Sequence, residues 1–265
     1  MSSGTETHYR TCNICEAMCG LAIEHRDGQV LSIRGDKDDP FSKGHVCPKA
    51  VALQDYYTDE DRLKTPLKKT SDGWESISWE QAFTEVASRL RGVQAEHGPN
   101  SVGVYLGNPN AHNFGNALLL PFFFKALGSQ SRFSSASADQ LPHHVASNFM
   151  LGAGMLIPVP DIDRTHFLLI IGANPVVSNG SMMTAAGVAK RIQAIQDRGG
   201  RVVVIDPRRT ETARAATEHF FIRPERDALL LLAMIYTVFE GGLVDLGHLA
   251  PLIEGLEEIQ RAVSD

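Results

Sequence analysis

The residues best suited to chemistry are four cysteines near the N-terminus. Cys12, Cys15 and Cys19 lie within eight residues, and Cys47 follows after 27 intervening residues; the 265-residue chain has no other cysteine. Three thiolates in one loop and a fourth returning from a distance can surround one inorganic centre, because four sulfur ligands suit both an iron–sulfur cluster and a zinc ion. The spacing therefore predicts a metal centre.

Three kinds of cysteine site compete for this pattern. Two disulfides would suit a small secreted domain, but residues 1–6 are polar and lack the apolar run of a signal peptide. Zinc sites usually take their ligands from two separated Cys-x2-Cys pairs, whereas here three cysteines are together and the fourth is alone. We therefore predict an iron–sulfur cluster and keep a zinc-stabilised domain as the alternative.

The segment between the cysteines must bring the chain back to them. Apolar and polar residues alternate over 21–34 on both sides of Asp27-Gly28, a pattern typical of a β-hairpin with a tight turn. The cysteine unit, residues 1–60, has few large apolar side chains. Much of its folding free energy should come from the metal centre, so we expect it to loosen when that centre is lost.

Two further motifs follow in order. They are Gly44-His45-Val46-Cys47-Pro48-Lys49 and Asp61-Arg62-Leu63-Lys64-Thr65-Pro66-Leu67. With the cysteine spacing, they resemble the N-terminal part of the molybdopterin oxidoreductases, the superfamily of formate dehydrogenase, nitrate reductase and DMSO reductase. The resemblance implies a 4Fe-4S cluster on the four cysteines and a molybdenum or tungsten bis(molybdopterin guanine dinucleotide) cofactor. It also implies that Lys49 lies between cluster and pterin and favours electron transfer; a solvated lysine is the alternative.

The composition of the chain limits which kinds of protein, partner and compartment remain possible. A chain that is 43% hydrophobic can bury a substantial core in two or three units. Its net charge of -6 disfavours a nucleic-acid partner, which would need a basic face. The longest apolar run, 228–239, is too short to cross a bilayer and predicts a buried helix. Without a secretory or twin-arginine leader, we expect the cytoplasm.

Residues 61–135 predict the first part of an α/β domain. Ser78 to Gln81 form a capping-box pattern that opens a helix ending at Gly98. A buried strand is predicted over 101–106 and an apolar helix over 114–127. The loop 107–112 would lie at the carboxyl end of the strand, where open α/β sheets bind ligands, although a plain surface loop fits equally well.

Residues 136–265 predict a partial dinucleotide-binding-like domain with a doubly wound sheet. Apolar strands are expected over 167–171 and 201–206, with a helix over 183–198 between them. Asp206 ends the second strand, where an acidic residue can accept hydrogen bonds from a ribose. The loop 172–178 lacks the three-glycine phosphate turn, which makes NAD the weaker hypothesis.

In the molybdopterin family the same layout binds one guanine dinucleotide half of the cofactor. The resemblance implies cofactor contacts from six residues, Gly172, Asn174, Pro175, Asp206, Pro207 and Arg208. These are also common turn residues after strands. Asp227 either contacts the nucleotide or caps the next helix. Glu225 stands where the family commonly has glycine, and it adds a side chain and a negative charge near the phosphates.

The resemblance also implies a ligand to the molybdenum or tungsten. Family members supply a Cys, selenocysteine, Ser or Asp before a helix that ends near a glycine, and the position counted back from Gly152 is Asp139. A carboxylate suits a high-valent metal. A helix N-cap role is the alternative, and Ser135 and Ser137 are nearby candidates. We interpret the adjacent His143 and His144 as polar lining or surface.

Together these features predict an α/β protein with a small N-terminal iron–sulfur domain followed by doubly wound cofactor-binding domains, incomplete at the C-terminus. The implied activity exchanges an oxygen atom or hydride equivalent with a small-molecule substrate and passes electrons to or from a partner protein. Lys49 and Asp139 would be its catalytic residues. Family enzymes are more than twice as long, so a truncated, non-catalytic iron–sulfur or zinc-stabilised module is the alternative.

Overall fold

The computed structural model describes residues 4–264, and the predictions that concern residues 1–3 and 265 lie outside them. The chain is of the mixed α/β class, as predicted. It divides into two units. The first unit runs to Pro160 and also includes Asn179–Gly187, and the second comprises Asp161–Ser178 and the chain from Val188 onward. The predicted domain boundaries stay a prediction.

The first unit begins with an antiparallel sheet in the order β1-β2-β3. Its strands are β1 (Glu6–Thr11), β2 (Gly20–Arg26) and β3 (Gln29–Gly35). Asp27 and Gly28 connect β2 to β3 with φ angles of 49° and 79°. Two positive φ values give the turn that matches strand twist, so the predicted hairpin is confirmed.

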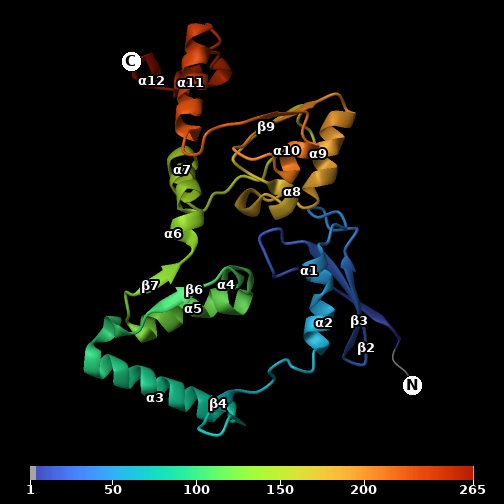
Figure 1. Cartoon of the computed structure of the whole chain (residues 1–265), viewed down its shortest axis with the longest axis vertical. Coiled ribbons are helices and arrows are strands. Elements are labelled where there is room, and N and C mark those ends of the chain that lie inside the picture. The colour runs from blue at the N-terminus through green and yellow to red at the C-terminus, as the bar shows by residue number, and fades with distance from the viewer. Residues whose placement is uncertain (1–3, 265) are drawn as a thin grey trace. The chain divides into compact units, whose positions relative to one another are not determined.

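Two short helices follow this sheet, α1 (Pro48–Val51) and α2 (Leu53–Thr58), and both contact β3 (Figure 1). The core of this part contains two of the cysteines themselves. Its buried members are Cys12, Ala17, Cys19, Leu21, Ile33, Ala50 and Ala186. Because the thiols are part of the core, the packing of this sheet and the state of the cysteines depend on each other.

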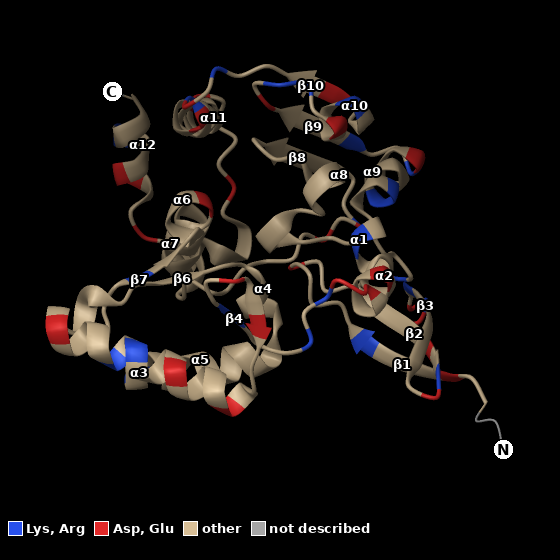
Figure 2. Cartoon of the chain, turned by 60° about the horizontal axis from the view of Figure 1, so that its bottom comes forward, with Lys and Arg blue, Asp and Glu red and all other residues tan. Residues whose placement is uncertain are grey.

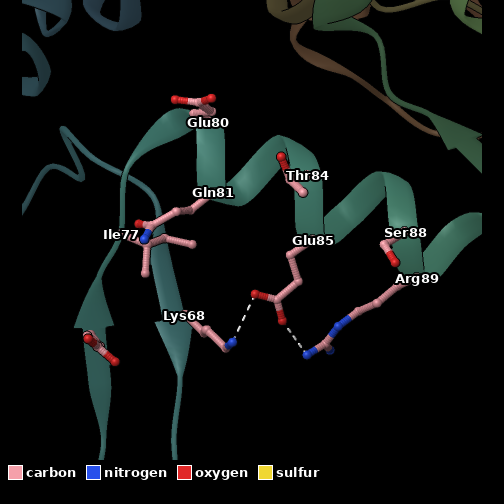
Figure 3. Close-up of a pocket in the computed structure, with 9 residues that line it drawn as sticks. Lys68, Ile77, Glu80, Gln81, Thr84, Glu85, Ser88 and Arg89 are labelled. Carbon is pink, nitrogen blue, oxygen red and sulfur yellow. Dashed lines mark hydrogen bonds and ion pairs between the residues drawn. The ribbon is translucent and has the colours of Figure 1, made fainter.

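The next element is a hairpin beside a long helix. Strands β4 (Leu67–Lys69) and β5 (Trp74–Ser76) precede α3 (Trp79–His97), and the predicted capping box at Ser78 and Gln81 is present. The three elements border a cavity of about 750 Å³, which Figure 3 shows. There Glu85 pairs with Lys68, 2.9 Å away, and with Arg89. The hydrogen bond from Lys68 lowers the pKa of Glu85.

A two-stranded parallel sheet completes the first unit. The sheet consists of β6 (Val104–Leu106) and β7 (Arg132–Ser134). The helices in the same part of the chain are α4 (Pro109–His112), α5 (Phe114–Leu127), α6 (Ala136–Asp139) and α7 (Leu141–Leu151). The predicted helix 114–127 is confirmed, with Pro121 inside it and Gly128 closing it at φ 67°. The predicted buried strand 101–106 is shorter and half-exposed, because a 3-10 turn occupies Pro99–Ser101 and only β7 pairs with the strand.

The second unit contains a three-stranded parallel sheet in the order β10-β9-β8. Its elements are β8 (Phe167–Ile171), α8 (Pro175–Ser178), α9 (Val188–Asp197), β9 (Arg201–Ile205), α10 (Glu211–Ala215) and β10 (Glu218–Phe220). Both predicted strands are confirmed. The helix predicted from residue 183 starts five residues later, because a 3-10 turn and Gly187 at φ 67° precede it. Ile192, Ile195, Val202 and Val204 form the buried centre.

The chain continues with α11 (Asp227–Glu240), a 3-10 helix (Gly247–Leu252) and α12 (Leu256–Ser264). The prediction that 228–239 is a buried helix is wrong in one respect: the helix forms, but none of its residues is buried. Helix α3 likewise has no buried residue, and it carries charges of both signs along its length (Figure 2). An apolar pattern specifies which face needs burial, but it does not supply the partner.

Across residues 4–264, no helix combines the length and the apolar character that a bilayer crossing requires.

Candidate metal and cofactor centre

The loop Cys12–Cys19 connects β1 to β2, and the sheet fixes both of its ends. Thr11 pairs with Gly20 in the strand register, and the Cys12 N–H donates to the Cys19 carbonyl at 2.8 Å. Inside the loop, the Met18 N–H donates to the Cys15 carbonyl at 3.3 Å. The hydrogen bonds of the hairpin therefore hold three thiols in one tight connection.

The fourth cysteine is returned to this loop by residues 36–47, which fold back on the strand ends. The Gly20 N–H donates to Ser42 Oγ at 3.0 Å, and Ser42 Oγ in turn donates to Asp39 Oδ2 at 2.7 Å. The hydrogen bonds that Asp39 accepts from the Ser42 hydroxyl and from the Ser42 N–H hold the pKa of Asp39 below its usual value. The sequence motifs did not point to Ser42 and Asp39, since a Ser three residues after an Asp is common in ordinary turns.

Two glycines allow this close return. A Cβ on Gly35 would lie 2.1 Å from the Gly44 carbonyl oxygen, and a Cβ on Gly20 would lie 2.5 Å from Asp39 Cβ. Both distances are far inside van der Waals contact. Only glycine fits at these positions, so the path that delivers Cys47 depends on them.

The four thiols lie close enough to affect one another electrostatically. All four cysteines are free; Cys12 and Cys19 are buried, and Cys15 and Cys47 are half-buried. Burial, and after it the neighbouring cysteines, raise the pKa of Cys12 and raise that of Cys19 to about 11. Thiolates crowded in this way need a strongly cationic partner. The donor set therefore fits an iron–sulfur cluster.

Within residues 4–264, no three His, Cys, Asp or Glu side chains meet the geometry of a single-ion site. A zinc site needs its ligands within about 2.3 Å of one point. A cubane cluster instead distributes its four cysteine ligands over four irons, which spreads the thiols apart. The mutual electrostatic effect of the four cysteines shows that their thiols are neighbours, as a four-cysteine cluster requires.

Lys49 follows Cys47 within α1 and is exposed, with no ion-pair partner among the described residues. Its ammonium is therefore available to a group outside the described side chains. The role that the family resemblance implies for it stays a prediction.

The loop 107–112 and the segment after β7 meet at one cavity of about 290 Å³. The two strands are parallel, so their carboxyl ends share one edge of the sheet. The polar residues that line the cavity are Asn108, Asn110, Ser134, Ser135 and Gln140. The sequence offered the loop 107–112 as either a ligand loop or a plain surface loop, and the resemblance implied a metal ligand in the segment after β7. The structure places the two segments together, and their role as a ligand site stays a prediction.

Asp139 ends α6 beside this cavity and is exposed. The N-cap residue of α7 is Gln140, so Asp139 is not the helix cap that we considered as the alternative. Its role as a metal ligand stays a prediction. His144 Nδ1 lies 2.7 Å from the Gly154 carbonyl oxygen, and His143 is exposed. The two rings therefore do not face one centre as a pair.

The predicted cofactor contacts of the second unit gather at the carboxyl edge of its sheet. Gly172 follows β8 at φ 62°, and a Cβ there would lie 3.8 Å from Asp227 Oδ1. Asp206 follows β9, is 8% exposed, and accepts a hydrogen bond from the Arg208 N–H at 2.7 Å. Asp227 is the first residue of α11 and not its N-cap, which is Arg226. The cap alternative is therefore wrong for Asp227.

Asn174 uses its side chain within the protein. Its Oδ1 accepts hydrogen bonds from Thr212 Oγ1 (2.7 Å) and Thr212 N–H (3.2 Å), and its Nδ2 donates to Glu211 Oε2 at 2.8 Å. This last bond is the main cause of the lowered pKa of Glu211. Asn174 thus ties the turn after β8 to α10. Glu211 and Thr212 are residues of this site that the sequence motifs did not reveal.

Glu225 has φ 67°, a left-handed conformation that is costly for a residue with a Cβ. This explains why glycine suits the position. We predict that Glu225→Gly stabilises the second unit by about 0.5–1 kcal/mol, the strain relieved less the entropy that glycine loses. Chemical denaturation measures the change in unfolding free energy. Glu254→Gly, at an exposed position without positive φ, is the control and should not stabilise; equal effects of the two would contradict the strain.

Comparison with protein families defines the class. Residues 62–250 match the molybdopterin oxidoreductase family model, and residues 5–58 match the model of the molybdopterin oxidoreductase Fe4S4 domain. The chain therefore belongs to the molybdopterin oxidoreductase family and carries its Fe4S4 domain. The predicted family membership is confirmed, and the family models support an iron–sulfur cluster in place of zinc.

Individual relatives are similar over nearly all of the chain. The thiosulfate reductase molybdopterin-containing subunit PhsA of Salmonella typhimurium is 28% identical over 96% of this chain and 32% of its own length. The F420-dependent formate dehydrogenase subunit alpha of Methanocaldococcus jannaschii is 27% identical over 95% and 36%. The structure of acetylene hydratase from Pelobacter acetylenicus matches with a TM-score of 0.76 at 26% identity, over 97% and 35%. The chain thus spans about a third of the length of these relatives.

Proposed function

We propose that this chain is the N-terminal part of a molybdopterin-dependent oxidoreductase in which electrons pass between a molybdenum or tungsten bis(molybdopterin guanine dinucleotide) centre and a 4Fe-4S cluster. The observation that carries the proposal is the grouping of four buried or half-buried thiols in the domain that matches the family's Fe4S4 model. When bound, the metal centre supplies two-electron chemistry and the cluster supplies single-electron steps. The protein binds and orients both groups.

Cys12, Cys15, Cys19 and Cys47 would hold the cluster. The thiol pKa values of Cys12 and Cys19 are raised, so these two cysteines bind as thiolates only when iron provides compensating positive charge. Burial in the core also excludes water from this side of the cluster, which protects it from hydrolysis.

The carboxyl edge of the β10-β9-β8 sheet would hold one guanine dinucleotide half of the cofactor. Gly172 leaves room for a close approach of the ligand, Asp206 offers a carboxylate to a ribose, and Arg208 is exposed for a phosphate. Asn174 acts there as a positioning residue, through Thr212 and Glu211. Pro175 and Pro207 fix the direction of the two turns, and Asp139 remains our candidate for the metal ligand.

Lys49 is proposed to link the two centres. We expect Lys49→Gln to slow internal electron transfer by about tenfold or more while the cluster assembles normally, because a hydrogen bond from a charged group is worth about 1.5–3 kcal/mol. Rapid-mixing measurements of cluster oxidation in the holoenzyme would report the rate. Lys64→Gln, which removes another exposed lysine, should leave the rate unchanged. Unimpaired transfer in Lys49→Gln would remove Lys49 from the path.

The experiment that tests the whole proposal combines metal analysis with pterin extraction. The chain is expressed with cofactor maturation, and iron, zinc, molybdenum, tungsten and extracted guanine-containing pterin are measured. Iron with pterin supports the oxidoreductase. Iron without pterin supports the alternative of a module that holds only the cluster. Zinc without iron would contradict the oxidoreductase and support the alternative of a zinc-stabilised module.

We also propose that the chain works in the cytoplasm with a separate electron-transfer protein and a small-molecule substrate. The relatives' description as subunits supports a separate partner protein. Fractionation of cells that express the natural gene tests the compartment, and recovery of the protein in the membrane or the periplasm would contradict it.

A further inference from the structure

His112 is a buried imidazole that the proposed function does not use. It ends α4, the short helix that follows β6, and its side chain is only 11% exposed. The Nε2 atom is inaccessible to solvent and has no hydrogen-bond partner. A buried polar atom left in this state costs free energy, so its presence calls for an explanation.

A carboxylate of the cysteine loop lies close to this atom. His112 Nε2 lies 3.7 Å from Glu16 Oε1, and the Glu16 side chain is 24% exposed. Glu16 directly follows Cys15 within the connection Cys12–Cys19. The separation exceeds a hydrogen bond by less than 1 Å, so a small adjustment of the loop would close it.

Residues of the same helix and its N-cap also line the cavity of about 290 Å³ at the carboxyl ends of β6 and β7. Asn108, Asn110 and Ala111 line it, together with Ser135 and Gln140. One turn of helix therefore reaches the cavity through its asparagines and the cysteine loop through its histidine. Among the described residues, this is a direct physical connection between the two sites of the first unit.

We propose that His112 is a positioning residue for the iron–sulfur cluster: its Nε2–H donates to Glu16 when the cluster is in place and thereby fixes the cysteine loop to the segment that lines the cavity. Assembly of the cluster orders the loop and brings the Glu16 carboxylate into hydrogen-bond range. The imidazole then has the partner that it otherwise lacks. Groups that hold the ligand loop in this way affect the lifetime and reduction potential of a metal centre.

This inference rests on the cluster that the proposed function assigns. It predicts that the cluster protects α4. In the reconstituted chain, hydrogen exchange of residues 107–112 should be slower than in the iron-free chain. In His112→Leu, which has no polar group at this position, that difference should disappear. A residue that merely fills space would leave the dependence on the cluster intact.

The lifetime of the cluster gives an independent measurement. The full chain is reconstituted with iron and sulfide, and the decay of its visible absorption is followed in the presence of a chelator. We expect His112→Leu to lose the cluster about tenfold faster than the unaltered chain, and His112→Gln, which keeps an N–H near the position of Nε2, to restore most of the lifetime. Glu16→Gln should shorten the lifetime, and combining it with His112→Leu should add nothing further.

The matched control is His97→Leu. His97 Nε2 lies 3.5 Å from Glu96 Oε1, but this pair is 59% and 75% exposed and lies at the end of α3. The His97→Leu substitution should leave the cluster lifetime unchanged. Equal lifetimes for His112→Leu and the unaltered chain, or additive effects of the Glu16 and His112 changes, would overturn the inference alone. If the unaltered chain takes up no iron, the proposed function fails with it.

Discussion

Replacing Cys47 by alanine is expected to abolish cluster binding. Cys47 is the ligand that returns from a distance, and three thiols in the loop Cys12–Cys19 cannot complete the coordination of four irons. Iron content and visible absorption of the reconstituted protein should fall close to background. Because Cys47 is half-buried and alanine fills much of its volume, the loss would arise from coordination and not from packing.

The same variant tests whether the cluster holds its domain together. The core there includes cysteines and few large side chains, so hydrogen exchange over residues 9–49 should become faster in Cys47→Ala. The unaltered chain stripped of iron is the control and should show the same pattern. Unchanged protection in both samples would show that this domain folds without its metal.

The second large effect is expected from Gly35→Ala. The added Cβ would lie 2.1 Å from the carbonyl oxygen of Gly44, a backbone atom that cannot rotate away. The return segment 36–47 would have to move, and Cys47 would move with it. We expect destabilisation of about 3 kcal/mol or more, at the upper end of the cost of overpacking, together with loss of iron. Thermal unfolding and iron analysis of the reconstituted chain measure the two effects.

Gly92→Ala provides the control for this change. Gly92 lies inside α3, and a Cβ added there would meet no atom within 4 Å beyond the neighbouring backbone of its own helix, so the same substitution should be neutral or stabilising. If Gly35→Ala retained its iron and its melting temperature, the close approach of the return segment to β3 would be refuted.

The local elements were largely predictable because their signals are local. The turn at Asp27-Gly28 requires two positive φ angles, and an Asp-Gly pair adopts them at little cost. The capping box at Ser78 and Gln81 satisfies backbone donors within one turn of helix. Such interactions involve residues only a few positions apart, so no knowledge of the fold is needed to recognise them.

Burial was less predictable. The run 228–239 forms a helix as its composition requires, yet none of its residues is buried, and β6 is shorter and more exposed than its apolar sequence suggests. Burial depends on what packs against a face, which is a property of segments distant in sequence. A single amphipathic or apolar pattern contains no information about that partner.

For the candidate sites, the sequence by itself determined the types of the ligands. Four cysteines with this spacing predict a sulfur-bound metal, since no other side chains in the segment supply thiolates, and the residues that follow two apolar strands predict a ligand edge. Tertiary structure alone decided how the residues are used. The fold engages the Asn174 amide oxygen in a hydrogen bond from Thr212 and requires glycine at Gly35. It also brings His112 close to Glu16 across 96 positions of sequence. These outcomes depend on contacts between segments far apart in the chain, which only the folded backbone brings within reach.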